Sequence, residues 1–265
     1  MHPMLNTAVR AARRAASIIQ RASDSIEHLR VERKGHNEFV TEVDRAAEKV
    51  IVETILDAYP THAILAEEGA LNPKGADSDF EWIIDPLDGT TNFLHGVPQY
   101  CVSIALRHRD QITQAVVYDP NRNDLFTATR GVGAFLNDRR IRVAKTREMA
   151  DALLCTGFPY REFGKIDAYT NMFKDFMQKS AGIRRPGAAA LDLAYVACGR
   201  FDGFWELGLA PWDIAAGSLL VLEAGGLITD LNGESDYLET GNLLAGTPKV
   251  FGQMLPIVQT HLGDR

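Results

Sequence analysis

The chain has 265 residues, of which 46% are hydrophobic and 24% are charged, a globular composition that can bury a sizeable core as one large domain or two fused lobes. Its formal net charge of -7 argues against a protein that binds nucleic acid chiefly through backbone phosphates, and we find no strong direct nucleic-acid signal. The longest apolar runs are shorter than the ~20 residues of a membrane-spanning helix, so no membrane segment is expected.

The N-terminal segment, residues 1–23, carries several arginines and no acid, as organellar transit peptides do. Its apolar residues recur at helical spacing, so we interpret it as an amphipathic helix packed on the body of the protein. The three cysteines are widely spaced among apolar neighbours, which is typical of buried thiols in a reducing compartment: Cys101, Cys155 and Cys198. The predicted localisation is cytoplasmic.

The predicted elements begin with two helices, continue as a strand meander and end with alternating helices and strands. In chain order they are helices 4–22 and 41–58, strands 63–66, 82–84, 100–107, 112–118, 125–129 and 153–156, helices 165–180 and 189–198, strand 204–206, helix 211–224, strands 227–230 and 243–245, and helix 248–262. This order predicts a layered α+β or α/β architecture.

The most informative segment directly follows the predicted strand 82–84. It reads Asp85-Pro86-Leu87-Asp88-Gly89-Thr90-Thr91-Asn92-Phe93. Because Pro86 cannot extend a strand ladder and Gly89 permits a tight turn, we expect the chain to leave the strand sharply there. Asp85 and Asp88 would then lie on one bend, as in a metal site, although a turn of this composition is as often structural as functional.

Three further segments place acids at the ends of predicted elements. Glu67 follows strand 63–66, Asp213 falls in the first turn of helix 211–224, and Asp44 follows Thr41 as in a capping box. Each acid has a structural explanation: a solvated loop for Glu67, helix capping for Asp213 and helix initiation for Asp44.

Taken together, these segments resemble the two signature motifs of the inositol monophosphatase family, one at 85–93 with Glu67 before it and one at Trp212-Asp213 with its Ala-Ala-Gly tail. Other family segments follow in the same order: Val40-Thr41 through Asp44, Gly131-Val132-Gly133-Ala134-Phe135-Leu136-Asn137, Gly187-Ala188-Ala189-Ala190 and Glu223-Ala224-Gly225-Gly226. The opening Met1-His2-Pro3-Met4-Leu5-Asn6 and the pair Arg184-Arg185 are similar to the bacterial SuhB-type members of the family.

The resemblance implies an α+β fold, a layered α/β/α/β/α sandwich forming one domain over residues 1–265 with lobes 1–150 and 151–265. It also implies a lithium-sensitive phosphatase that hydrolyses myo-inositol monophosphate, or related small polyol phosphates, by metal-activated water. Members of the family are usually dimers, so a homodimer is expected.

The resemblance further implies a magnesium centre. Glu67, Asp85, the Leu87 carbonyl and Thr90 would hold one ion, and Asp85, Asp88 and Asp213 a second. Acids gathered in this way raise one another's pKa unless cations neutralise them. All-oxygen ligands favour Mg²⁺, Mn²⁺ or Ca²⁺ over zinc. A third ion is expected where the polar loop at Lys34-Gly35 closes the site.

The other roles are also carried over by resemblance. Thr90 would polarise the attacking water, with Asp44 supporting Thr90 from behind and Glu67 and Asp85 completing the catalytic set. The substrate contacts would come from Asp88, Gly89, Thr90, Gly187, Ala188, Ala189, Glu206 and Asp213. At Ala188 relatives commonly carry Thr or Ser, so this chain lacks a hydroxyl donor there.

Two other enzyme classes are weighed. A related lithium-sensitive phosphatase acting on fructose bisphosphate or an adenosine bisphosphate would use the same metals, but the shortage of basic residues around 187–213 favours a monophosphate. An aspartyl-phosphate phosphatase has acids two apart as D-x-D, whereas Asp85 and Asp88 are three apart with Pro86 between them.

A binding role belongs to a different class. SuhB-type relatives are associated with transcription antitermination beside Nus factors on ribosomal RNA operons, so the resemblance also implies contact with a Nus factor or RNA polymerase. The basic runs at 139–142 and 184–185 are candidate surfaces for such a contact, or for a dimer.

Overall fold

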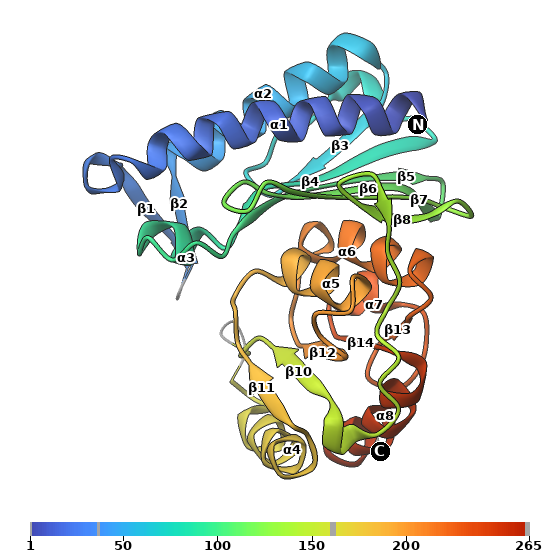
Figure 1. Cartoon of the computed structure of the whole chain (residues 1–265). Helices are drawn as coiled ribbons and strands as arrows, with labels where there is room; N and C mark the ends of the chain where they lie inside the picture. The colour runs from blue at the N-terminus through green and yellow to red at the C-terminus, as the bar shows by residue number, and fades with distance from the viewer. Residues whose placement is uncertain (1, 36–37, 160–162, 263–265) are drawn as a thin grey trace.

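Five layers stack in the computed structural model of the chain, which describes residues 2–35, 38–159 and 163–262. Helices α1 (Pro3–Ser23) and α2 (Glu42–Ala58) cover the outer face of a seven-stranded sheet (Figure 1). Helices α5 (Ala189–Ala197) and α6 (Pro211–Glu223) lie between that sheet and a five-stranded one, and α4 (Ile166–Lys179) and α8 (Pro248–Leu262) close the far side. The predicted α/β/α/β/α sandwich is confirmed.

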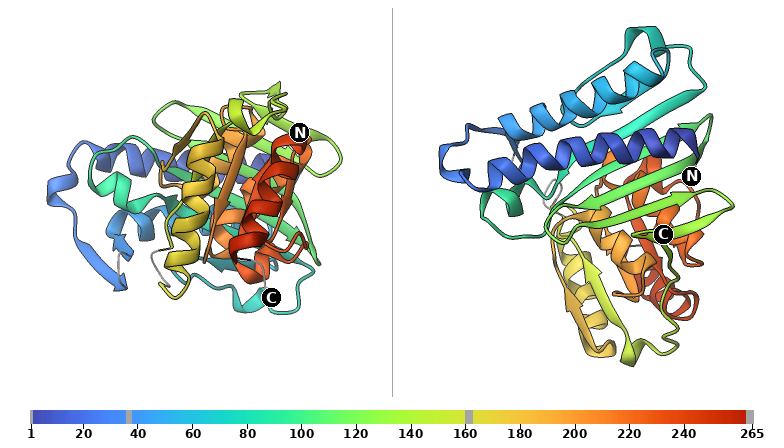
Figure 2. Two further views of the ribbon diagram at one scale, coloured as in Figure 1. Left: turned by 90° about the horizontal axis from the view of Figure 1, so that it is seen from below. Right: turned by 45° about the horizontal axis from the view of Figure 1, so that its top comes forward.

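The seven-stranded sheet is antiparallel except for its first pair, in which β3 runs parallel to β4. In sheet order its strands are β3 (Ala63–Ala66), β4 (Phe80–Asp88), β5 (Cys101–His108), β6 (Gln111–Asp119), β7 (Asp124–Thr129), β8 (Gly133–Leu136) and β9 (Arg139–Arg140). A row of buried alanines on α1 lets this helix pack closely on the sheet and on α2, as its apolar spacing predicts. Figure 2 shows α1 and α2 running along the same face of the sheet.

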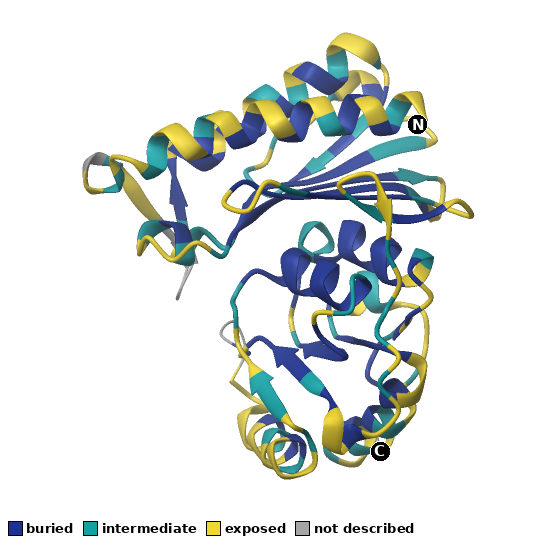
Figure 3. Ribbon diagram, viewed as in Figure 1, coloured by how far each residue is buried: buried dark blue, intermediate teal, exposed yellow. Residues whose placement is uncertain are grey.

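The chain passes to the five-stranded sheet between β9 and β10. The strand order there is β11 (Gly182–Arg184), β10 (Leu153–Thr156), β12 (Gly203–Glu206), β14 (Leu243–Gly246) and β13 (Leu227–Thr229). All nine residues of α5 are buried, because one sheet covers it on either side (Figure 3). Apart from Asp192 and the hydroxyl group of Tyr195, the side chains of α5 are apolar on all faces rather than on one stripe. The division into lobes 1–150 and 151–265 stays a prediction.

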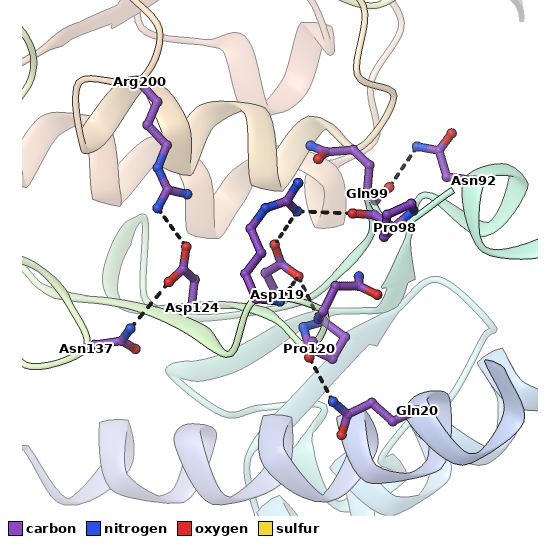
Figure 4. Close-up of polar contacts among 11 residues, drawn as sticks. Gln20, Asn92, Pro98, Gln99, Asp119, Pro120, Asp124, Asn137 and Arg200 are labelled. Atoms are coloured by element: carbon purple, nitrogen blue, oxygen red, sulfur yellow. Dashed lines mark hydrogen bonds and ion pairs between the residues drawn. The ribbon is translucent and has the colours of Figure 1, made fainter. Parts of the chain in front are cut away.

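The turn between β6 and β7 joins three of the layers at one edge (Figure 4). Gln20 of α1 donates to the carbonyl oxygen of Pro120 at 2.8 Å, and Arg200, beyond the end of α5, pairs with Asp124 at 2.8 Å. These contacts fix α1 and α5 on opposite faces of the same sheet.

The structure corrects the expected path of the chain after Ile84. Strand β4 continues through Asp88 instead of ending at Ile84. Its register against β5 shifts between Asp85, opposite Ser103, and Asp88, opposite Cys101. The missing N–H of Pro86 falls in this β-bulge, where no ladder bond is required of it.

The expected polar loop at Lys34-Gly35 is also wrong, because this segment ends strand β1 (Val31–Gly35), which pairs with β2 (Glu38–Thr41). Residues 36–37 of that connection lie outside the described residues. The remaining short elements, which sequence periodicity did not predict, are α3 (Thr90–Leu94), α7 (Tyr237–Thr240) and the 3-10 turns η1 (Ile26–His28), η2 (Pro73–Gly75) and η3 (Met149–Asp151). In the described part of the chain, no helix is both long and apolar enough to cross a bilayer.

His62 stands in a column of aromatic rings at the start of the large sheet. Its ring stacks on Tyr59 and on Phe80, with 4.8 Å between ring centroids in each case, and Phe80 stacks in turn on His108. The indole Nε1 of Trp82 donates to His62 Nδ1 at 3.1 Å, which requires that this nitrogen carry no proton. Burial lowers the pKa of His62.

We therefore expect acid to destabilise the fold through His62. Because its pKa is lower in the folded than in the unfolded chain, the stabilisation is complete above the unfolded value of about 6.5 and is lost as the pH falls below it. Thermal melts on either side of this pH should show a larger fall in Tm for the wild type than for His62→Gln. The same substitution at the exposed His95 is the control, and equal falls in all three proteins would contradict the expectation.

Candidate active site

A cavity of about 440 Å³ opens where the ends of β3 and β4, helix α3 and the first turns of α5 and α6 meet. Carboxylates, backbone and aromatic side chains form its walls. The lining residues are Phe39, Glu67, Asp85, Leu87, Asp88, Gly89, Thr90, Thr91, Asn92, Phe158, Phe163, Arg185, Gly187, Ala189, Glu206, Leu209 and Asp213.

Parallel pairing brings Glu67 and Asp85 to the same edge of the sheet. Ala66 of β3 lies opposite Ile84 of β4, and the Glu67 N–H donates to the Ile84 carbonyl at 3.1 Å. The next residue on each strand is therefore an acid at one end of the sheet. The buried carboxylate of Glu48 on α2 accepts the N–H groups of Glu68 and Ala70, at 2.8 and 3.0 Å, and so fixes the loop that carries Glu67.

The β-bulge brings carboxylate, carbonyl and hydroxyl oxygens of residues 85–90 close together. Asp85 Oδ1 accepts the Leu87 N–H at 2.9 Å, and the Leu87 carbonyl accepts the Thr90 hydroxyl at 3.0 Å. Gly89 precedes α3 with φ 94°, a left-handed conformation that strains any residue with a Cβ. A Cβ there would also lie 2.9 Å from the Gln99 carbonyl oxygen, so both the backbone angle and the space require glycine.

Asp44 stands behind Thr90 and is fully buried. The Thr90 hydroxyl lies 2.9 Å from Asp44 Oδ1, while Asp44 Oδ2 accepts the Thr41 N–H at 2.8 Å. Thr41 and Asp44 form the capping box of α2, as their spacing predicts. Burial raises the pKa of Asp44, and its hydrogen bonds from Thr41 and Thr90 oppose that rise.

Asp88 links the first sheet to the middle helix layer. Its Oδ2 accepts the Ala190 N–H at 2.8 Å, in the first turn of α5. Ala188 is the N-cap residue of α5 and has no side-chain cap, so Asp88 supplies from another strand the acceptor that a Ser or Thr would supply locally. Gly187 and Ala189 line the cavity, whereas the buried Ala188 is not among the lining residues.

The last acid of the predicted metal set comes from the start of α6. Asp213 lies in the first turn, after Pro211, and its Oδ2 accepts the Ala210 N–H at 2.7 Å. The capping interaction expected for this acid is therefore present, and the same side chain also lines the cavity. Ser103 of β5 donates to the Trp212 carbonyl at 3.2 Å and ties this turn to the large sheet.

The electrostatics of the cavity suit divalent cations. Burial, and then the charges of Glu67, Asp88 and Asp213, raise the pKa of Asp85 well above its usual value. Burial likewise raises the pKa of Asp88 to about 7. Within the described residues no three His, Cys, Asp or Glu side chains form a ready-made ligand cage. The donor set facing the cavity is nevertheless made of carboxylate, carbonyl and hydroxyl oxygens, which is the chemistry that fits Mg²⁺.

The predicted site residues thus gather at one place, with Asp44 directly behind Thr90 and Ala188 behind the wall. Their individual roles stay predictions. Sequence reasoning missed several wall residues, chiefly Phe39, Phe158 and Arg185. The Arg185 guanidinium lies over the Phe158 ring, 5.4 Å from its centroid. The available signal was that Arg185 lies two positions before the Gly187 segment.

The burial and mutual repulsion of the acids predict how Asp85→Asn will change the thermal stability of the protein. Because the pKa values of Asp85 and Asp88 are higher in the folded than in the unfolded chain, the folded state retains more protons and loses stability as the pH rises from about 4 to about 7. In chelator at alkaline pH, Asp85→Asn should therefore melt at a higher temperature than the wild type, and the gap should narrow on acidification.

Added Mg²⁺ should reverse this order, because it should raise the Tm of the wild type but not that of Asp85→Asn. Asp77→Asn, at an exposed position, is the matched control and should follow the wild type. A lower Tm for Asp85→Asn than for the wild type in chelator would contradict the account of charge strain.

Comparison with known proteins agrees with this geometry. The sequence model of the inositol monophosphatase family matches residues 1–262. The Nus factor SuhB of Pseudomonas aeruginosa is 52% identical over 99% of this chain and 98% of that protein, and the Nus factor SuhB of Escherichia coli is 50% identical over 100% and 98%. The crystal structure of the extragenic suppressor protein suhB from Bartonella henselae superposes with a TM-score of 0.95 at 42% identity, covering 98% of this chain and 100% of that one. An inositol monophosphatase from Anabaena gives a TM-score of 0.83 at 37% identity over 97% and 95%. The chain belongs to the inositol monophosphatase family, and this membership implies a phosphatase.

Proposed function

We propose that this chain is a magnesium-dependent phosphomonoesterase that hydrolyses myo-inositol monophosphate and related small polyol phosphates to the free polyol and phosphate. The observation that carries the proposal is the convergence of Glu67, Asp85, Asp88 and Asp213 on one cavity that Glu206 also lines. Such a set of acids would repel a phosphate ester unless cations were bound between them.

The acids and their backbone neighbours form two overlapping ligand sets. Glu67, Asp85, the Leu87 carbonyl and Thr90 would hold one Mg²⁺, and Asp85, Asp88 and Asp213 a second, with a third ion as a further expectation. When bound, the ions would lower the pKa of water and neutralise charge that develops on the phosphate oxygens.

Thr90 and Asp44 would direct the attacking water. The Thr90 hydroxyl has two acceptors within reach, Asp44 Oδ1 and the Leu87 carbonyl, but only one hydrogen to donate. When it donates to Asp44, its oxygen lone pairs can accept a hydrogen bond from water. The water oxygen then bonds to phosphorus as the ester P–O bond breaks. The water gives up one proton to solvent, and the departing polyol oxygen takes up one proton from solvent.

The opposite wall would recognise the polyol. Asp88 and Glu206 present carboxylate oxygens that accept hydrogen bonds from ring hydroxyls, while Gly187 and Ala189 bring backbone to the cavity. Arg185 weakens the argument against a bisphosphate substrate, because it adds a positive charge to a cavity wall where no basic residue was expected. A fructose or adenosine bisphosphate therefore belongs in the same comparison of rates.

A phosphate-release assay on myo-inositol 1-phosphate tests the proposal. With Mg²⁺ the wild type should turn over, and chelator or lithium should stop it. Asp85→Asn and Asp213→Asn should each lose about tenfold or more in kcat/KM, roughly 1.4 kcal/mol in the barrier. Asp77→Asn is the control of equal charge change and should keep full activity. If a bisphosphate is hydrolysed faster than the monophosphate, the bisphosphate is the better candidate substrate. Detection of a labelled phosphoaspartate would contradict direct attack by water.

A second role in transcription antitermination is supported by the relatives named Nus factor SuhB, which match nearly the whole chain at 50–52% identity. In this role the chain would act in the cytoplasm as a homodimer and contact a Nus factor or RNA polymerase. The candidate surfaces are basic and exposed, at Arg139 and Arg140 on β9 and at Arg184 on β11.

The two roles can be separated with Asp85→Asn in a pull-down experiment. The variant should retain the Nus factor or polymerase that the wild type captures, because the substituted side chain is buried and lies away from the surface. Loss of the partner with the variant would tie binding to the metal site, and absence of any such partner with the wild type would contradict the second role.

A further inference from the structure

Gly157 occupies a position next to Glu206 that the catalytic assignments do not use. It directly follows β10, which runs parallel to β12 with Thr156 opposite Trp205. Gly157 is therefore the next position beside Glu206, the last residue of β12. Both residues are buried, and Glu206 forms part of the cavity wall.

The Glu206 carboxyl group fills the space where a side chain on Gly157 would be. A Cβ on Gly157 would overlap this group, whose Cδ and two oxygens are its three nearest atoms. The backbone at this position is not left-handed, so alanine is acceptable to the backbone itself. Position 157 therefore requires glycine only because the Glu206 carboxyl group occupies the space that a side chain would need.

The backbone around Gly157 is firmly fixed. The Gly157 carbonyl accepts the Tyr169 hydroxyl at 2.8 Å, and the Thr156 hydroxyl lies 2.7 Å from the Trp205 carbonyl, which ties β10 to β12 one residue before Glu206. These groups are buried, and burial raises the pKa of Tyr169 to about 12, so its hydroxyl keeps the proton that it donates. With the backbone held, a larger residue at 157 must displace the carboxylate.

A second buried acid lies near the Glu206 carboxyl group. Asp192 of α5 is fully buried, and among the described residues its Oδ1 has no hydrogen-bond partner. Burial, and then the charge of Glu206, raise the pKa of Asp192, so the two acids are neighbours. A Glu206 carboxylate displaced toward Asp192 would approach this second acid and leave its place on the cavity wall.

We propose that Gly157 is a positioning residue for substrate specificity. Because Gly157 has no side chain, the Glu206 carboxylate can occupy the space beside it on the cavity wall, where the carboxylate can accept a hydrogen bond from a polyol hydroxyl. The inference rests on the proposed phosphatase function and deepens it. Thr156 and Tyr169 fix the backbone at Gly157, and the position of Glu206 then favours polyol phosphates over esters without a hydroxyl group.

The test compares Gly157→Ala with the wild type on two substrates, myo-inositol 1-phosphate and p-nitrophenyl phosphate, which has no hydroxyl for Glu206 to read. The variant should raise KM for the inositol ester by about tenfold or more, as expected when a hydrogen bond to a charged group is lost, with kcat nearly unchanged. Hydrolysis of p-nitrophenyl phosphate should stay within about twofold of the wild type. Gly252→Ala is the matched control, since an added Cβ in α8 meets nothing within 4 Å.

A double-mutant cycle separates positioning from general damage. Glu206→Ala should reproduce the loss on the inositol ester, and adding Gly157→Ala to it should cost nothing more. If Gly157→Ala alone melts early or fails to fold, Glu206→Ala should restore its Tm, because removing the carboxylate removes the overlap. This readout does not depend on activity.

Three results would overturn the inference: an unchanged KM in Gly157→Ala, an equal loss on both substrates, or a further loss or uncorrected unfolding in the double variant. A wild type inactive on both esters with Mg²⁺ would instead overturn the proposed phosphatase function, and the specificity role with it. Because the wild type is measured first, the two failures are distinguishable.

Discussion

The constraint on which the rest of this structure depends is the close approach of like charges at a poorly solvated place. Asp85 and Asp88 are buried and share one cavity with Glu67 and Asp213. A fold under selection for stability alone would separate these groups or replace them with neutral ones. The proposed cations would offset this repulsion, so the destabilisation of the free protein is consistent with the proposed metal binding.

The layered architecture brings these acids to the cavity from several different elements. The two parallel strands end in acids at one edge of the large sheet, the bulge in β4 turns Asp85 and Asp88 toward the cavity, and the middle helices approach it with their N-termini. Each acid also has a local structural role. Asp44 closes the capping box of α2, Asp213 accepts an N–H in the first turn of α6, and Asp88 accepts one from α5. Because these acids also accept N–H groups at helix N-termini, the fold itself holds their carboxylates in place.

Much of this arrangement could be predicted from the sequence, because long amphipathic helices and apolar strands leave a clear periodicity. The helix predicted at 211–224 is α6 to within a residue, and the one at 4–22 is α1. What could not be predicted depends on neighbours distant in sequence. Pro86 could stay in β4 only because β5 accommodates a bulge opposite it, and Arg185 reached the cavity wall only because α5 docks beneath β4 and β5. The local sequence gives the position of Arg185 two residues before the Gly187 segment, but not the packing that brings it to the cavity.

The bond from the Ala190 amide to the Asp88 carboxylate has a broader consequence. It joins the Asp88 side chain, in the first half of the chain, to α5, a helix of the buried middle layer in the second half. A fragment ending before α5 would keep the acids of the large sheet but lose the amide that orients one of them. Both halves of the chain therefore contribute to the acidic centre. A fused or circularly permuted chain that keeps all the acids would still have to keep the contact between Asp88 and the start of α5.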